Sequence, residues 1–108
     1  MRKRKNNMAR AKQTYIGNIL NIYPDICSLP PEQRTSSEQR CVDIVDTMLG
    51  AVNRMPDADK RRALIDMVYF QQSHGLVKAA VQIPIDKTTA IKWNVEVIKL
   101  MLETMQLL

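Results

Sequence analysis

Residues 76–93 read LVKAAVQIPIDKTTAIKW, and this stretch predicts two helices joined by a tight turn. Residues 76–81 form a short helical run, residues 83–85 form a turn around a proline, and Asp86 opens a longer helix. A small residue at Ala80, an apolar turn and a polar helix entry are typical of a helix-turn-helix. That motif holds one helix where it can meet the groove of DNA. The stretch therefore indicates a binding module and not a catalyst.

The composition agrees with a small helical protein. The chain has 108 residues, enough for one domain, with 45% apolar residues, 5% aromatic residues and only three glycines. No apolar run approaches the roughly 18 residues that a membrane-spanning helix needs. The charged start at residues 1–5 is not followed by an apolar run, so no secretory signal is expected.

The first helix and the loop after it are predicted from spacing and from prolines. Apolar residues recur at helical spacing over residues 8–22. We expect this helix to end before Pro24, because the residue that precedes a proline is disfavoured in the helical region. A connecting loop over residues 25–35 follows, and Pro30 and Pro31 should exclude a helix there.

Capping signals bound the next two helices. The second helix should begin at Ser36 or Ser37, each of which has Glu or Gln two or three positions later, as in a capping box. The third should open at residues 56–59, where two acids suit the positive end of the helix dipole. It should stop at residues 73–75, with Gly75 in the left-handed conformation of a helix end.

Together these signals predict an all-α fold, a small bundle of about five helices. It should carry a C-terminal helix-turn-helix at about residues 75–101 and a long last helix. Residues 13–108 are expected to form a single helical domain, and residues 1–12 a basic N-terminal arm.

The charge of the chain belongs to that arm. The arm holds six basic residues and no acid: Arg2, Lys3, Arg4, Lys5, Arg10 and Lys12. Since the whole chain carries +5, the other residues sum to −1. The arm either binds phosphates without sequence preference or is a solvated tail.

The candidate DNA-contacting residues surround the start of the long helix. They are Lys87, Thr88, Thr89, Ile91 and Lys92, together with Lys78 on the preceding short helix. Lysine can meet a guanine edge or a phosphate, and threonine offers a hydroxyl and a methyl group. Asp86 is expected to cap this helix by accepting from the amides of Thr88 or Thr89.

The opposite face of the long helix should pack against the rest of the domain. Ala90, Val97 and Met101 lie on that face by helical spacing. Trp93 is expected in the core, in preference to a contact with DNA.

Nothing in the sequence indicates an enzyme. Cys27 and Cys41 are expected to be reduced thiols, with one disulfide between them as the alternative, and neither belongs to a zinc-binding motif. His74 has no acidic or nucleophilic partner near it in sequence. Metal, nucleotide and nucleophile motifs are absent, so we expect no catalytic residue, no metal and no cofactor.

The chain also resembles a known family. Tyr69-Phe70, a short gap, and then residues 76–90 resemble the C-terminal part of RinA/ArpU-type phage transcriptional activators. Residues 18–24, which end in Tyr23-Pro24, are similar to the tyrosine-containing first helix of that family. The resemblance implies a sigma region 4-like helix-turn-helix in a phage or prophage late-gene activator, working in the bacterial cytoplasm.

The resemblance also implies which side chains face DNA. By position these are Lys87, Thr88, Ile91 and Lys92. The chain departs from the family at residues 93–97, which stand where the family usually has a basic stretch. Four lysines against three acids after residue 75 leave this part at only +1, which disfavours strong DNA binding by one copy.

Three functions remain open at this point. The first is a transcription regulator that binds double-stranded DNA. The second is a protein-interaction module that docks on RNA polymerase or another protein through the apolar last helix. The third is the DNA-recognition subunit of a phage packaging enzyme. The salt dependence of DNA binding separates the first two.

The end of the long helix predicts self-association. An apolar stripe continues there at spacings of three and four: Ile98, Met101, Leu102, Met105 and Leu108. Monomers rarely expose such a stripe, so we expect a homodimer or a larger assembly. The alternative is that the stripe folds back on the first helix, against Tyr15, Ile16 and Ile19.

Overall fold

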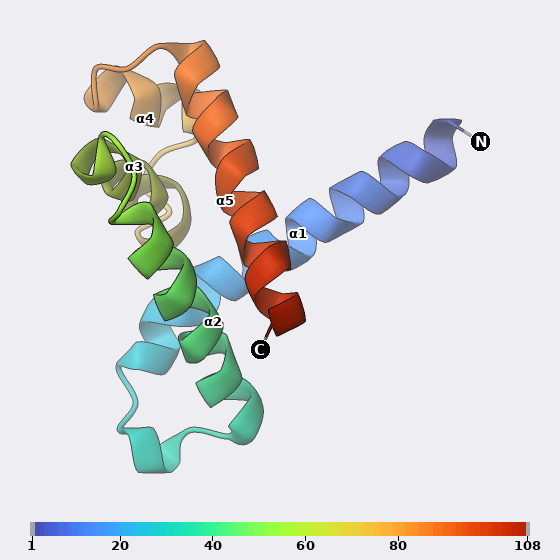
Figure 1. Cartoon of the computed structure of the whole chain (residues 1–108), viewed down its shortest axis with the longest axis vertical. Coiled ribbons are helices and arrows are strands. Elements are labelled where there is room, and N and C mark those ends of the chain that lie inside the picture. Colours follow the sequence, from blue (N-terminus) through green and yellow to red (C-terminus); the bar gives the residue numbers. More distant parts are fainter. Residues whose placement is uncertain (1, 108) are drawn as a thin grey trace.

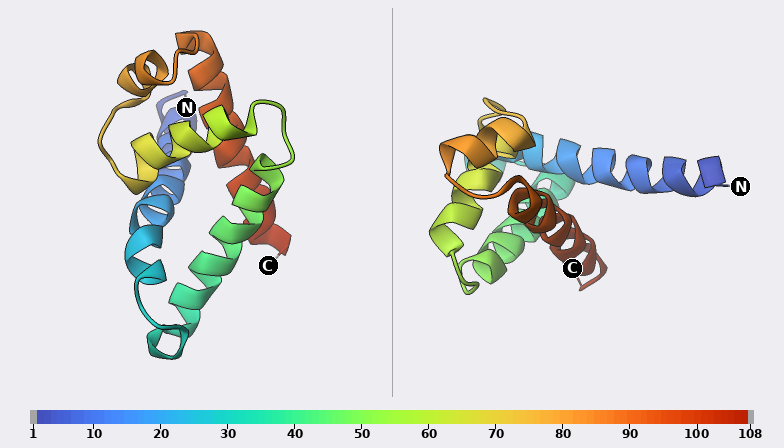
Figure 2. Two further views of the ribbon diagram at one scale, coloured as in Figure 1. Left: turned by 90° about the vertical axis from the view of Figure 1, so that its left-hand side faces the viewer. Right: turned by 90° about the horizontal axis from the view of Figure 1, so that it is seen from above.

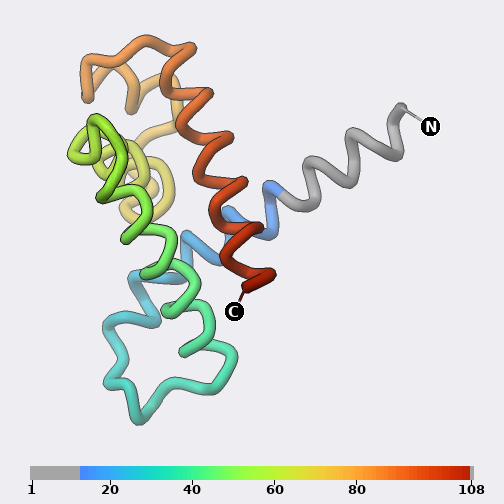
Figure 3. Tube along the Cα trace, in the orientation of Figure 1, coloured from blue at the N-terminus to red at the C-terminus, as the bar shows by residue number. Residues whose placement is uncertain are grey.

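The computed structural model describes the backbone of residues 2–107 and the side chains of residues 13–107 (Figure 3). The described chain is helical and contains no strand, which confirms the predicted fold class (Figure 1). Its elements are α1 (Arg2–Cys27), η1 (Pro31–Gln33), α2 (Ser36–Val52), α3 (Ala58–Ile65), η2 (Asp66–Phe70), α4 (Leu76–Gln82) and α5 (Lys87–Leu107).

Two groups of predicted residues lie outside the described side chains. They are the basic arm (Arg2, Lys3, Arg4, Lys5, Arg10 and Lys12) and the terminal Leu108. Within the described part of the chain, no helix combines the length and the apolar character that a membrane crossing requires.

Helix α1 corrects two predicted boundaries. It begins before residue 8, and it continues through Pro24 to Cys27. Pro24 lies in the last turn and has no N–H to donate to the Leu20 carbonyl, so one backbone hydrogen bond is lost there. The amide of Ser28 still donates to the Pro24 carbonyl at 3.1 Å, and Ile26, beyond the proline, is 4% exposed. Burial of Ile26 favours the extra turn.

The connection to α2 also differs from the prediction. Pro31 does not exclude a helix, since it occupies the first position of the short 3-10 helix η1, where its missing N–H costs little. The cap of α2 is Thr35, not Ser36 or Ser37. The Glu38 amide donates to Thr35 Oγ1 at 3.1 Å, and the Thr35 amide donates to Glu38 Oε1 at 2.9 Å. These two bonds form a complete capping box.

The third helix widens at its end. The residues of η2 form a π-helical turn in which the Gln71 amide donates to the Asp66 carbonyl at 2.7 Å. This turn places Phe70 against Tyr23 of α1, with ring centroids 5.1 Å apart, and brings the Tyr69 hydroxyl to Asn94 of α5.

The chain reverses after η2 at Gln72, whose φ is 52°. The predicted left-handed role of Gly75 is therefore wrong. Gly75 has φ −69° and ψ 168° and stands at the N-cap of α4. The signal failed because a reversal three residues earlier already ends the preceding helix.

Helices α1 and α2 diverge from the turn at η1, and α3 with η2 spans from the end of α2 to the middle of α1 (Figure 2, left). Helix α5 packs on both α1 and α2 and forms one side of the larger hydrophobic cluster. The buried members of this first cluster are Ile16, Ile19, Leu20, Ile44, Val45, Met48, Leu49, Val52, Ile65, Val97 and Met101.

A second, smaller cluster lies where α3, α4 and the start of α5 meet. Its buried members are Leu64, Ala79, Ala80, Ile83, Ala90 and Trp93. Trp93 is 6% exposed, which confirms that it packs in the core.

We predict that Trp93→Ala lowers the free energy of unfolding by roughly 3–5 kcal/mol, as large core truncations do. The cause is the loss of the largest side chain in the second cluster. Chemical denaturation followed by circular dichroism measures the change. In the parent protein, Trp93 emission should be blue-shifted until the protein unfolds. A red-shifted emission from the folded state would contradict the buried placement.

A second prediction concerns alkaline pH. Burial raises the pKa of the Tyr69 hydroxyl, against the opposing effect of its bond to Asn94. Burial and the hydrogen bond to Asp46 raise the pKa of Tyr23. Because the folded state favours the protonated phenols, their contribution to stability is complete below the unfolded pKa of about 10 and falls above it. Tyr69→Phe should flatten this loss in denaturation curves measured between pH 9 and 11, and an unchanged pH slope would contradict it.

Candidate nucleic-acid interface

Helix α4, the connection after it and the start of α5 lie together at one end of the molecule (Figure 1). Backbone hydrogen bonds hold the connection. The Ile83 amide donates to the Ala79 carbonyl and the Ile85 amide to the Ala80 carbonyl, both at 3.0 Å. α5 then starts with the Ala90 amide donating to the Asp86 carbonyl at 2.9 Å. The sequence therefore placed this pair of helices and its turn correctly, while its DNA-binding role stays a prediction.

Small side chains let the two helices approach each other closely. Ala79 and Ala90 are completely buried, and Ala80 is 3% exposed. Leu64 of α3 packs in the same cluster, so α4 and α5 are both supported by the third helix. The start of α5 is thus held by packing from one side, and its other side is free to carry a binding surface.

Five of the six predicted DNA-contacting residues are exposed: Lys78, Lys87, Thr88, Ile91 and Lys92. Thr89 is the exception. It is partly buried and faces a shallow hollow between α3 and α5 that is also lined by Asp57, Lys60, Pro84, Ile85, Asp86 and Trp93. The phase of the helix turns Thr89 toward α3, so it contributes little to an outward surface.

The predicted side-chain cap of α5 is not formed. Asp86 contributes its backbone carbonyl to the first turn, but its carboxylate accepts no hydrogen bond from Thr88 or Thr89, both of which the structure describes. It remains exposed beside the hollow and leaves one negative charge at the entry of α5.

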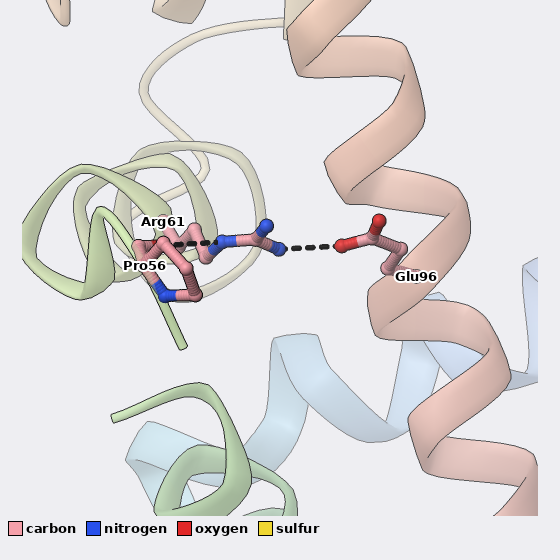
Figure 4. Close-up of polar contacts among 3 residues, drawn as sticks. All are labelled: Pro56, Arg61 and Glu96. Carbon is pink, nitrogen blue, oxygen red and sulfur yellow. Dashed lines mark hydrogen bonds and ion pairs between the residues drawn. The ribbon is translucent and has the colours of Figure 1, made fainter. Parts of the chain in front are cut away.

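Arg61 fixes α5 relative to α3 (Figure 4). Its Nε donates to the Pro56 carbonyl at 2.9 Å, and its Nη1 donates to Oε2 of Glu96. The guanidinium carbon lies 4.8 Å from the centroid of the Trp93 ring, a cation–π distance. Sequence reasoning missed this residue, because its two partners on α5 are more than thirty positions away and no local pattern marks them.

The pairing changes the charge that the surface presents. Glu96 is one of only three acids after residue 75, and Arg61 neutralises it on the α3 side of the helix. Because Arg61 balances its charge, Glu96 offsets less of the positive charge of the exposed lysines, which are Lys87, Lys92 and Lys99. The local field is more positive than the net charge of the segment suggests.

The far end of the molecule has the opposite charge. Residues 22–50, which form the turn at η1 and its flanking helices, carry two basic residues against five acids. Residues 76–95 carry three lysines against one acid, Asp86. The two segments occupy opposite ends in Figure 1. The described domain is therefore charge-separated although its sum is near zero.

The predicted self-association stripe divides in the structure. Met101 is completely buried in the first cluster, so it is a core residue and offers nothing to a second folded copy. Ile98, Leu102 and Met105 pack partly against the same cluster and keep some exposed surface. Self-association itself stays a prediction.

The residues expected from the fold-back alternative also divide. Ile16 and Ile19 of α1 share the first cluster with Met101, whereas Tyr15 is 57% exposed. The helix spacing that favoured the stripe did not show which of its members face α1 and which face outward.

Other chemistry-bearing side chains remain dispersed. Cys27 is an exposed free thiol and Cys41 a partly buried one, and burial raises the pKa of the Cys41 thiol. The His74 ring contacts the adjacent Ser73 hydroxyl through Nδ1, at 2.8 Å. Among the described side chains, no three His, Cys, Asp or Glu residues are grouped so that they could hold a metal ion.

We predict that a double-mutant cycle of Arg61→Ala and Glu96→Ala gives a coupling free energy of roughly 1 kcal/mol in denaturant unfolding. The side chains are 15% and 34% exposed, which places the pair between surface and buried ion pairs. The pair Arg62–Asp66 is the control, since its side chains are 40% and 35% exposed and lie one helical turn apart. Its coupling should be about half as large or less. Equal couplings for the two pairs would show that Arg61 does not join α3 to α5.

Comparisons with models of known families, with curated proteins and with solved structures find no match to this chain.

Proposed function

We propose that the protein is a DNA-binding transcription regulator that inserts the start of α5 into the major groove. One observation carries the proposal. The exposed residues Lys87, Thr88, Ile91 and Lys92 occupy the outward face of a helix whose inward face is fixed by Ala90 and Trp93. A rigidly held helix start with exposed lysine and threonine is what groove recognition requires.

The four residues differ in the contacts that they offer. Lys87 and Lys92 supply cations that suit a guanine edge or a phosphate. Thr88 offers a hydroxyl and a methyl group, and the Ile91 side chain offers only an apolar contact, for example with a thymine methyl. Lys78 of α4 is exposed at the same end of the molecule and suits a backbone phosphate.

The basic arm completes the proposal. The reading helix carries few charges, and non-specific affinity comes mainly from neutralised phosphates. Six basic residues within residues 2–12 can supply that affinity. The resemblance to phage late-gene activators suggests a phage or prophage promoter as the target and RNA polymerase as a further partner.

We predict that Lys87→Ala and Lys92→Ala each weaken binding to a selected DNA site by roughly 1–3 kcal/mol if they read base edges. Binding-site selection on random DNA supplies the site, and fluorescence anisotropy measures the affinity. Arg54→Ala is the control, because Arg54 is exposed on the connection between α2 and α3. The proposal would be contradicted if the protein selected no DNA sequence and if neither lysine substitution changed its affinity for DNA.

A separate prediction concerns the arm. Removing residues 2–7 deletes four cations. The slope of log affinity against log salt should then flatten by up to about four units, since each phosphate that the arm no longer neutralises reduces the slope by roughly 0.9. The reduction should be equal on selected and random DNA. A slope that does not change would exclude the arm from the interface.

A further inference from the structure

One flank of α5 carries an apolar stripe that the proposed DNA contact does not use beyond its first residue. Its members alternate at spacings of four and three: Ile91, Val95, Ile98, Leu102 and Met105. Ile91 is 45% exposed and Val95 is 55% exposed, while the other three pack partly against the first cluster. This alternation is the heptad pattern by which one helix packs along another.

Lysines border the stripe. Lys92 and Lys99 directly follow two of its members, and Lys87 stands near its start. All three are exposed. In heptad terms they occupy the positions whose charges select the partner helix.

The two acids in the body of α5 lie beyond the lysines on the same flank, farther from the apolar stripe. Glu96 pairs with Arg61 of α3, and Glu103 lines a hollow together with Glu96, Lys99, Met55 and Leu100. Along its first half, from Ile91 to Ile98, the stripe is therefore bordered by lysines, and the nearest acid, Glu96, is already paired with Arg61.

This charge pattern discriminates between possible occupants. A second copy packed on the same stripe would bring lysines opposite lysines, in either a parallel or an antiparallel arrangement, and like charges at these positions disfavour pairing. DNA would satisfy the lysines but would leave Val95 against a polar surface. An amphipathic helix with acidic flanks satisfies both the apolar stripe and its lysine border.

We propose that this flank of α5 is a docking site for an acidic amphipathic helix of a partner protein. Residues 91–102 offer a seam of roughly 16 Å at 1.5 Å per residue, which matches about one and a half heptads of the partner. Since Ile91 and Lys92 also belong to the proposed DNA surface, the docked helix would exclude DNA. Only this competition rests on the proposed function.

The test is direct binding of a designed peptide to the full chain, without DNA. The probe is a labelled three-heptad helical peptide with leucine at the two core positions and glutamate at the flanking positions. Two matched peptides carry lysine at the flanks or the same acidic composition in scrambled order. Fluorescence anisotropy at two salt concentrations measures each affinity.

The acidic helical peptide should bind at least about tenfold more tightly than either matched peptide, a difference of roughly 1.4 kcal/mol. Val95→Asp should weaken it by roughly tenfold or more, since a charge would enter the apolar seam. Val81→Asp, a control at a valine of α4 that is 73% exposed, should change it by less than about twofold. Lys99→Glu should weaken binding most at low salt.

Three results would overturn the proposal. The scrambled acidic peptide could bind equally well, which would show that binding depends on charge alone and not on the apolar stripe. Val95→Asp could leave binding unchanged while circular dichroism shows the variant folded. Sedimentation equilibrium could show a stable dimer that Val95→Asp dissociates, which would mean that a second copy covers the seam. Failure of the DNA-binding experiments alone would leave the peptide result intact.

Discussion

Four buried side chains of α5 tie the two hydrophobic clusters of the protein together. Ala90 and Trp93 belong to the second cluster, and Val97 and Met101 belong to the first. One helix therefore contributes to both clusters, and its regular backbone fixes the position of one cluster relative to the other. Because a helix has a fixed rotation per residue, burial of these four side chains also decides which side chains face outward.

Arg61 refines this arrangement at one point. Packing fixes which face of α5 is buried, and a guanidinium bonded to Glu96, stacked on Trp93 and bonded to the Pro56 carbonyl adds a polar link between α5 and α3. A planar group with several donors suits such a role better than a lysine, whose charge is not directional. The same side chain therefore contacts both the buried tryptophan and the acid one turn later on α5.

Helix existence was predictable because it depends on local spacing. The helical spacing of apolar residues in α1 and the proline turn before α5 gave the correct elements. Boundaries failed where a distant contact decided them. Burial of Ile26 extends α1 past Pro24. In the π-turn η2, Phe70 packs against Tyr23 and the Tyr69 hydroxyl bonds to Asn94. Tyr23 and Asn94 are both far from η2 in sequence, so no local pattern indicates these contacts.

The candidate surface was predictable to the extent that helical phase determines it. Exposure of Lys87 and Lys92 follows from burial of Ala90. The phase was misjudged at residues that lie between two stripes. Thr89 turns toward α3. Met101 was placed both on the packed face and in the self-association stripe, and its burial confirms the first placement. Arg61–Glu96 joins residues thirty-five positions apart and has no local signal.

The opposite charges at the two ends of the domain have a kinetic consequence. A body with acids around the η1 turn and lysines around α4 and α5 has an electric dipole along its length. A polyanion that approaches it exerts a torque before any contact forms, so the molecule rotates during diffusion until its lysine end leads. For the proposed DNA contact, encounters with the lysine end leading would then outnumber those expected from random orientation, and the acidic end would point away from the DNA.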